Sequence, residues 1–210
     1  MKHKISHSLY TYWNEIRALR VAPRRFEIEP SRIASFLPDT FILDCGEPGK
    51  TRFRLAGTRM STLLGRDVRD GAFLDLFRPA DHKTLQDALQ LTIEQAGVAL
   101  LTTAPCSAGE PVTPPHRQIE ILLLPLFHTQ NAVTRLLGCA VPLEPVIESK
   151  ALAHLPQSLV AHETIWPDGR PHAVLQQMNR QSPFAPELRG ARIVASDRRR
   201  FRVVDGGKTT

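Results

Sequence analysis

The chain has 210 residues, of which 42% are hydrophobic and 23% charged, so it can bury the core of one domain or of two small ones. Its formal net charge of +6 favours loose association with acidic partners or nucleic acid, without bearing on the fold. It contains no membrane-length apolar run, no signal-peptide pattern and no Cys-x-x-Cys spacing, so we expect a cytoplasmic protein without membrane span or structural zinc.

The first predicted element is an amphipathic helix within residues 1–22. Its apolar side chains recur three and four positions apart, at Leu9, Tyr12, Trp13 and Ile16, and the same spacing next reaches Leu19 or Arg20. Such a stripe either packs on the helix's own domain or forms the seam of a homodimer. Tyr12 and Trp13 are therefore candidate partner contacts.

A β-hairpin is predicted after this helix. Pro23 ends the helical region, and Pro30 opens a short helix that runs to residue 36. Residues 40–43 and 52–56 read as strands, the second with alternating charged and apolar side chains. The tight turn at residues 47–49 requires that the two strands pair antiparallel.

Several helices follow the hairpin. A short helix is expected at residues 58–64, with Gly65 as its stop, and a short apolar piece at residues 73–77. Pro79 then opens a longer helix that ends at Gly97 and buries one face, at Leu85, Leu89 with Ala88, Thr92 or Ile93, and Ala96.

Three more strands are predicted, at residues 98–103, 117–127 and 135–141. A turn-rich stretch at residues 104–115 separates the first two, and Gln130-Asn131 turns the chain before the third. From residue 144 onward prolines interrupt every apolar stretch, so residues 144–210 are expected to be an irregular, mobile extension.

The order of two strands, several helices and three strands is that of a PAS domain. The segments FRLAGTRMSTLLGRDVRDGAFLDLF, IEILLLPL and RLLGCAVPL, together with the Tyr12-Trp13 helix and Pro23-Arg24-Arg25, resemble a bacterial, largely alphaproteobacterial family of stand-alone PAS-domain proteins. The resemblance covers roughly residues 8–143. It implies an α+β fold in which a five-stranded antiparallel sheet carries helices on one face, with a PAS-like domain at residues 23–143. It also implies a sensory or regulatory role with no established common ligand.

Gly57-Thr58 lies where a phosphate-binding loop would begin. Such a loop needs several exposed backbone N–H groups and a lysine or further glycines. A single glycine before Thr58 instead indicates a flexible turn, with the threonine hydroxyl available as a helix cap.

The sequence offers little chemistry for a cofactor or a reaction. None of Cys45, Cys106 and Cys139 lies where a flavin-binding PAS domain needs its reactive cysteine, and we expect them in or near the core, with Cys106 in a loop. His82 comes too early in its helix to ligate haem, and His162-Glu163 lacks the second histidine of a zinc helix. We therefore expect no cofactor, no metal and no enzyme.

An arginine cluster near the C-terminus completes the candidate sites. Arg198, Arg199, Arg200 and Arg202 surround Phe201, which indicates either a solvated tail or a contact with nucleic acid, an acidic partner or a localisation factor. The cluster also resembles the arginine-rich start of the cyclic-di-GMP-binding PilZ domain, although only eight residues follow it.

The leading functional hypothesis is a non-enzymatic PAS regulator that acts through a protein partner, with or without gating by a small ligand between sheet and helices. The N-terminal helix and an exposed sheet face would be its output surfaces. The alternative is a nucleic-acid-associated regulator that uses the basic tail.

Overall fold

A seven-stranded antiparallel sheet forms the centre of the molecule in the computed structural model, which describes residues 1–47, 49–107, 110–111, 118–127, 132–144 and 155–173. The strands follow the spatial order β2-β1-β6-β5-β3, and both β4 and β7 pair with β3. Their bounds are β1 Thr40–Glu47, β2 Lys50–Ala56, β3 Val98–Ser107, β4 Glu110–Pro111, β5 Ile119–Phe127, β6 Val133–Pro142 and β7 Gln157–Ile165. The predicted α+β class is confirmed, and the five predicted strands are the five of the central order.

The helices are α1 Lys4–Arg17, α2 Thr58–Leu64 and α3 His82–Gln95. Short 3-10 turns lie between them, at Arg25–Glu27, Pro30–Ile33, Leu37–Asp39, Phe73–Leu76 and Pro79–Asp81. Helix α2 has the predicted bounds, and its stop, Gly65, adopts the left-handed conformation with a φ of 65°.

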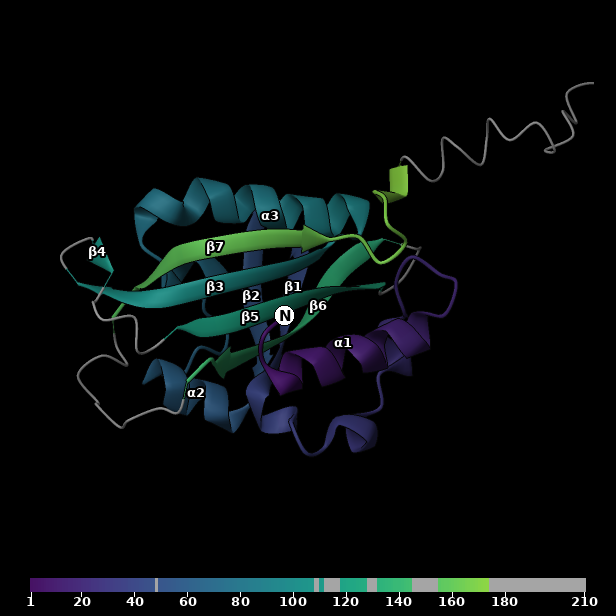
Figure 1. The fold of residues 1–210 in the computed structure, drawn as a ribbon, viewed down its shortest axis with the longest axis horizontal. Coiled ribbons are helices and arrows are strands. Elements are labelled where there is room, and N and C mark those ends of the chain that lie inside the picture. Colours follow the sequence, from purple (N-terminus) through teal and green to yellow (C-terminus); the bar gives the residue numbers. More distant parts are fainter. Residues whose placement is uncertain (48, 108–109, 112–117, 128–131, 145–154, 174–210) are drawn as a thin grey trace, which may run out of the picture.

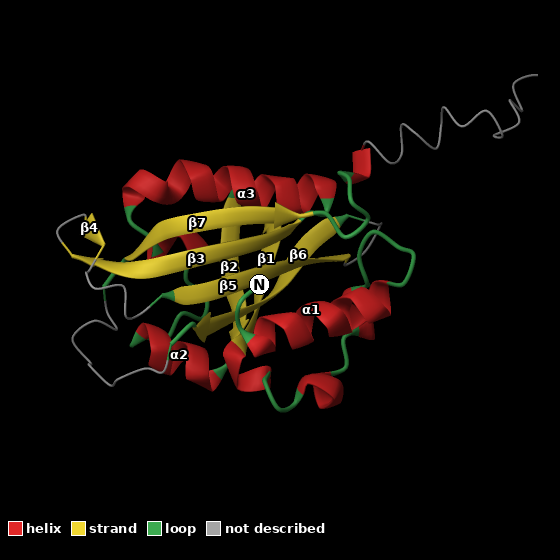
Figure 2. Cartoon of the chain, viewed as in Figure 1, coloured by secondary structure: helices red, strands yellow, loops and turns green. Residues whose placement is uncertain are grey.

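Helices cover both faces of the sheet, which corrects the prediction that they lie on one. Figure 2 shows α1 and α3 on either side of the strands. One face packs on α2, α3 and the 73–76 turn, through Phe53, Phe73 and Leu85 among others. The other packs on α1, whose Leu9 and Trp13 are fully buried against β5 and β6 residues such as Leu122 and Leu137. The sheet face expected to be exposed is therefore occupied by the chain's own first helix.

Strand β7 falls within the extension that was predicted to be irregular, so that prediction is wrong for residues 157–165. It pairs antiparallel with β3 from Val98↔Ile165 to Pro105↔Gln157. The prolines that suggested irregular chain lie just outside the strand, at Pro156 and Pro167, so β7 itself contains no proline and each of its residues keeps its backbone N–H.

Two glycines act by their small size and not by flexibility. Gly57 has an ordinary φ of −70°, but a Cβ there would stand 2.2 Å from the carbonyl oxygen of Pro38. Thr58 is then the first helical residue and provides no side-chain cap, contrary to the sequence interpretation. At the end of α3 the left-handed residue is Ala96, while Gly97 gives room to Trp166.

Candidate functional site

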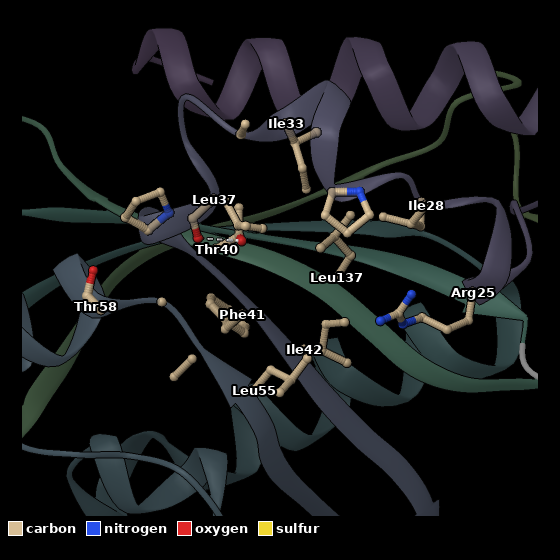
Figure 3. A pocket seen from close by; sticks show the side chains of 15 residues that line it. Arg25, Ile28, Ile33, Leu37, Thr40, Phe41, Ile42, Leu55, Thr58 and Leu137 are labelled. Atoms are coloured by element: carbon tan, nitrogen blue, oxygen red, sulfur yellow. Dashed lines mark hydrogen bonds between the residues drawn. The ribbon is translucent and has the colours of Figure 1, made fainter.

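A pocket of about 470 Å³ lies between the sheet and the chain that follows α1 (Figure 3). Its roof is the stretch of 3-10 turns at residues 25–39, here called the cover segment, and its floor is formed by β1, β2 and β6. The residues that line it are Arg25, Ile28, Pro30, Ile33, Ala34, Leu37, Pro38, Thr40, Phe41, Ile42, Leu55, Ala56, Gly57, Thr58 and Leu137.

The floor is apolar because of the strand register. Ile42 of β1 pairs with Leu55 of β2 on one side and with Leu137 of β6 on the other, so these three side chains share one face of the sheet. The cover segment places Ile28 and Ile33, both buried, above them. At the rim Leu37 and Leu55 keep 41% and 52% of their surface exposed, so the pocket opens to solvent through apolar side chains.

Among the described residues that line the pocket, Arg25 is the one with an ionisable side chain. Figure 3 shows its guanidinium pointing from one end of the pocket toward Ile42 and Leu137, with Thr58 at the opposite end. Its Nε is buried and has no hydrogen-bond partner, and within the described part of the chain its side chain forms no ion pair. The nearby arginines differ, since Arg20 pairs with Glu27 and Arg32 with Glu15.

The neighbouring carboxylate, Glu27, does not neutralise Arg25. Both of its oxygens accept from Arg20 Nη1 at 2.9 Å, and one also accepts the backbone N–H of Arg24 at 2.7 Å. Burial raises the pKa of Glu27, but these bonds lower it below its usual value in the balance. The Thr40 hydroxyl is likewise committed, because it donates to the Leu37 carbonyl at 2.8 Å.

The cover segment is tied to α1 through Tyr12. The Glu29 backbone N–H donates to the Tyr12 hydroxyl at 2.7 Å, and that hydroxyl lies 3.3 Å from the Glu29 carbonyl oxygen. Arg32 pairs with Glu15 of α1 at 3.0 Å and lies over the Tyr12 ring, 5.1 Å from its centroid. A displacement of the cover segment would therefore strain its contacts with α1.

The candidate partner contacts of α1 are buried. Trp13 is fully buried and donates from Nε1 to the Pro125 carbonyl at 2.9 Å, and Tyr12 keeps only 7% of its surface exposed. In this structure neither ring is accessible to a partner, because the apolar stripe packs on the chain's own sheet. Leu19, placed in the stripe by its spacing, follows the helix and is fully exposed. Arg198, Arg199, Arg200 and Arg202 lie outside the described residues.

The three cysteines, His82 and His162 all lie outside the pocket lining. Burial raises the pKa of the Cys45 and Cys139 thiols to about 12 and also raises that of Cys106, which disfavours the reactive thiolate. Cys106 is buried on β3 and does not lie in a loop. His82 is half-buried in the first turn of α3, and its Nε2 lies 3.1 Å from the Phe77 carbonyl oxygen. His162 is exposed on β7.

Sequence reasoning missed Arg25 as a site residue, although it stands in the Pro23-Arg24-Arg25 motif. Its isolation depends on Arg20 engaging Glu27, which a linear pattern does not reveal. Within the described residues, no cluster of three or more His, Cys, Asp or Glu side chains is arranged to hold a metal ion. The described helices include none with the length and apolarity needed to cross a membrane.

Comparison with known proteins gives one family match. A family model described as PAS domain matches residues 1–141. A solved structure described as an RNA-binding light-oxygen-voltage receptor is similar with a TM-score of 0.36 and 18% identity, over 68% of this chain and 34% of the receptor chain. The chain thus spans about a third of that receptor's length. Among curated proteins, no sequence matches this chain.

Proposed function

The chain belongs to the PAS domain family, and we propose that it is a non-enzymatic sensory or regulatory protein that acts through contact with a protein partner. The family match spans residues 1–141 and includes α1 and the cover segment. Membership of the PAS domain family supports the sensory or regulatory role, and action through a protein partner is our proposal.

The pocket is suited to binding and not to catalysis. Its described lining residues combine apolar side chains with the Arg25 cation, and the Thr40 hydroxyl donates to a backbone carbonyl. General acid–base or nucleophilic chemistry needs a second polar group within hydrogen-bond reach of the first. The two buried acids of the described residues are not in the lining and serve structure: Asp39, in the cover segment, pairs with Arg59 at 2.8 Å, and Glu120 accepts from the N-terminal backbone.

We further propose that a small ligand in this pocket gates the partner contact. The observation that carries the proposal is that the cover segment roofs the pocket and is also bonded to α1 through Tyr12. A ligand under the cover segment would favour the arrangements of the segment and of α1 that accommodate it. It would shift the equilibrium by its difference in affinity for the two states.

Filling the pocket tests this function without knowledge of the natural ligand. Ala34 and Leu55 line the pocket and are exposed, so Ala34→Phe and Leu55→Trp add volume there with little strain. Leu91→Trp on α3 is the matched control, since Leu91 is exposed to a similar degree but lies away from the pocket. The full chain and each variant would be compared by amide hydrogen exchange and by quantitative affinity purification from the native extract.

We expect the two pocket variants, and not the control, to change exchange in both the cover segment and α1 and to change the amount of a co-purifying protein. Unchanged exchange in α1 would contradict the gating. A partner set that is the same for all three variants and the wild type would contradict regulation through the pocket.

The nucleic-acid alternative rests on residues 198–202, outside the described residues. Several exposed arginines of the described part are already paired with acids, among them Arg20, Arg32 and Arg69. The alternative stays a prediction, and a steep salt dependence of binding to nucleic acid would support it.

A further inference from the structure

Arg25, which has no acid partner among the described residues, presents a positive charge to an apolar pocket, and this combination specifies a class of ligand. The buried Nε has no partner, and leaving a buried donor without a hydrogen bond is unfavourable. The surrounding walls are apolar, and the part of the lining that the structure describes contains no carboxylate. A ligand that satisfies both features carries one negative charge at one end and an apolar body behind it.

We propose that the pocket binds a medium-chain monocarboxylate, with its carboxylate on Arg25 and its apolar body along Ile42, Leu137 and Leu55 toward Thr58. The proposal rests on the ligand gating proposed above and names its ligand class. Guanidinium and carboxylate groups match in planar, two-point geometry, so a carboxylate in the pocket can accept from two N–H groups of the Arg25 guanidinium end that points into it (Figure 3). A phosphate monoester would bring a second charge and polar oxygens, for which the described lining residues supply no further cation.

The size of the pocket agrees with such a ligand. Its 470 Å³ lies within the range of about 300–1,000 Å³ that is usual for small-molecule sites. A water-sized group takes about 30 Å³ in the liquid, so a pocket that is partly open holds on the order of a dozen non-hydrogen atoms. Decanoate has that size and is a suitable probe.

Charge on the surrounding elements favours an anion at this end of the pocket. Glu27 is engaged by Arg20, and Glu15 of α1 by Arg32, so neither competes for Arg25. Arg24, next to Arg25, is exposed and lies over the Phe26 ring, 5.9 Å from its centroid. Arg24 lies outside the lining, which makes it a matched control for the removal of a charge from this segment.

The experiment measures binding of carboxyl-labelled decanoate to the full chain by calorimetry and by the carbon resonance of the label. The wild type is compared with Arg25→Met, Arg25→Lys and Arg24→Met, and decanol and butyrate serve as control ligands. We expect saturable binding of decanoate, a loss of about tenfold or more in Arg25→Met, and little change in Arg24→Met. We also expect an intermediate loss in Arg25→Lys, and weaker binding of decanol and butyrate than of decanoate.

Several outcomes overturn the inference. They are absence of saturable decanoate binding, equal binding by decanol, and equal affinity of Arg25→Met and the wild type. Thermal melts verify that each variant is folded, and Leu55→Trp, at an exposed position, should block binding without removing the charge. This binding test can fail independently of the gating. If decanoate binds through Arg25 but leaves amide exchange in α1 unchanged, the ligand site is supported and its proposed role in signalling is refuted.

Discussion

Replacing Trp13 tests whether α1 belongs to the folded core or is a separable appendage. Its ring is completely buried between α1 and the sheet, with a relative exposure of 0%. Its Nε1 donates to the Pro125 carbonyl at 2.9 Å, across 112 residues of sequence. The Arg17 guanidinium lies over the ring, 5.6 Å from the centroid.

These contacts set the expected cost. Trp13→Ala removes a large buried ring and leaves a cavity, which typically costs about 3–5 kcal/mol of the free energy of unfolding. Trp13→Phe retains most of the apolar contact but leaves the Pro125 carbonyl without its donor, at about 1–3 kcal/mol. For a domain of this size each kcal/mol lowers the Tm by about 2–4 °C, so Trp13→Ala should lower it by about 6–20 °C.

The assay is thermal and urea unfolding of the full chain at several protein concentrations, with light scattering to measure the oligomeric state. Tyr10→Ala is the control on the same helix, since Tyr10 is only half-buried, and it should cost less. An unchanged midpoint in Trp13→Ala would refute the packing of α1 on its own sheet. A midpoint that rises with protein concentration would indicate instead that the stripe is buried between two copies.

Three further predictions follow from buried contacts. Burial raises the pKa of Glu120, but hydrogen bonds from the Ser6 hydroxyl and from the Lys2 and His3 N–H groups bring it below its usual 4.5. Because its pKa is lower in the folded than in the unfolded chain, the Glu120 carboxylate stabilises the fold above about pH 4.5, and this stabilisation is lost as the pH falls through the folded pKa. Glu120→Gln should therefore reduce the loss of unfolding free energy at acid pH. Gly57→Ala, whose Cβ would stand 2.2 Å from Pro38 O, should destabilise by about 1–3 kcal/mol in chemical denaturation. Gly46→Ala, whose Cβ would stand 3.3 Å from the Asp44 side chain, should have little effect. Truncation after Glu144 removes β7 and exposes the edge of β3, so it should lower the Tm and promote aggregation. Truncation after Ala173 keeps β7 and should do neither. Equal Tm values of the two truncated chains would show that β7 adds nothing to the stability of the fold.

The local elements could be read from sequence where short-range chemistry determines them. Helix α2 and its glycine stop were predicted residue for residue, because a left-handed C-terminal glycine is a local requirement. The β1–β2 hairpin followed from its tight turn and from alternation in the second strand. The stripe of α1 was also predicted, although its spacing could not tell whether it faces the chain's own sheet or a second copy.

The features that the sequence did not predict depend on contacts between residues far apart in the chain. Strand β7 lies in a proline-rich region, and only its pairing with β3, about 60 residues earlier in the chain, shows that residues between the prolines form a strand. The placement of α1 on the second face of the sheet depends on β5 and β6, which follow it by more than 100 residues. The pocket escaped prediction for the same reason, since its roof and floor come from separate parts of the chain.

The two faces of the sheet differ in how completely they are filled, and this difference bears on where a ligand acts. On the α2 and α3 face, Phe41, Phe53, Phe73 and Phe77 form a continuous row of rings with centroids 5.2–5.8 Å apart. Such packing leaves little room for a ligand on that face without displacement of core side chains. The α1 face holds the pocket, and its cover segment contacts α1 through the Glu29–Tyr12 hydrogen bond, the Arg32–Glu15 ion pair and the apolar cluster of Ile28 and Ile33. A ligand in the pocket would therefore act first on the cover segment and α1, the two elements in which the pocket variants, and not the α3 variant Leu91→Trp, are expected to change amide exchange.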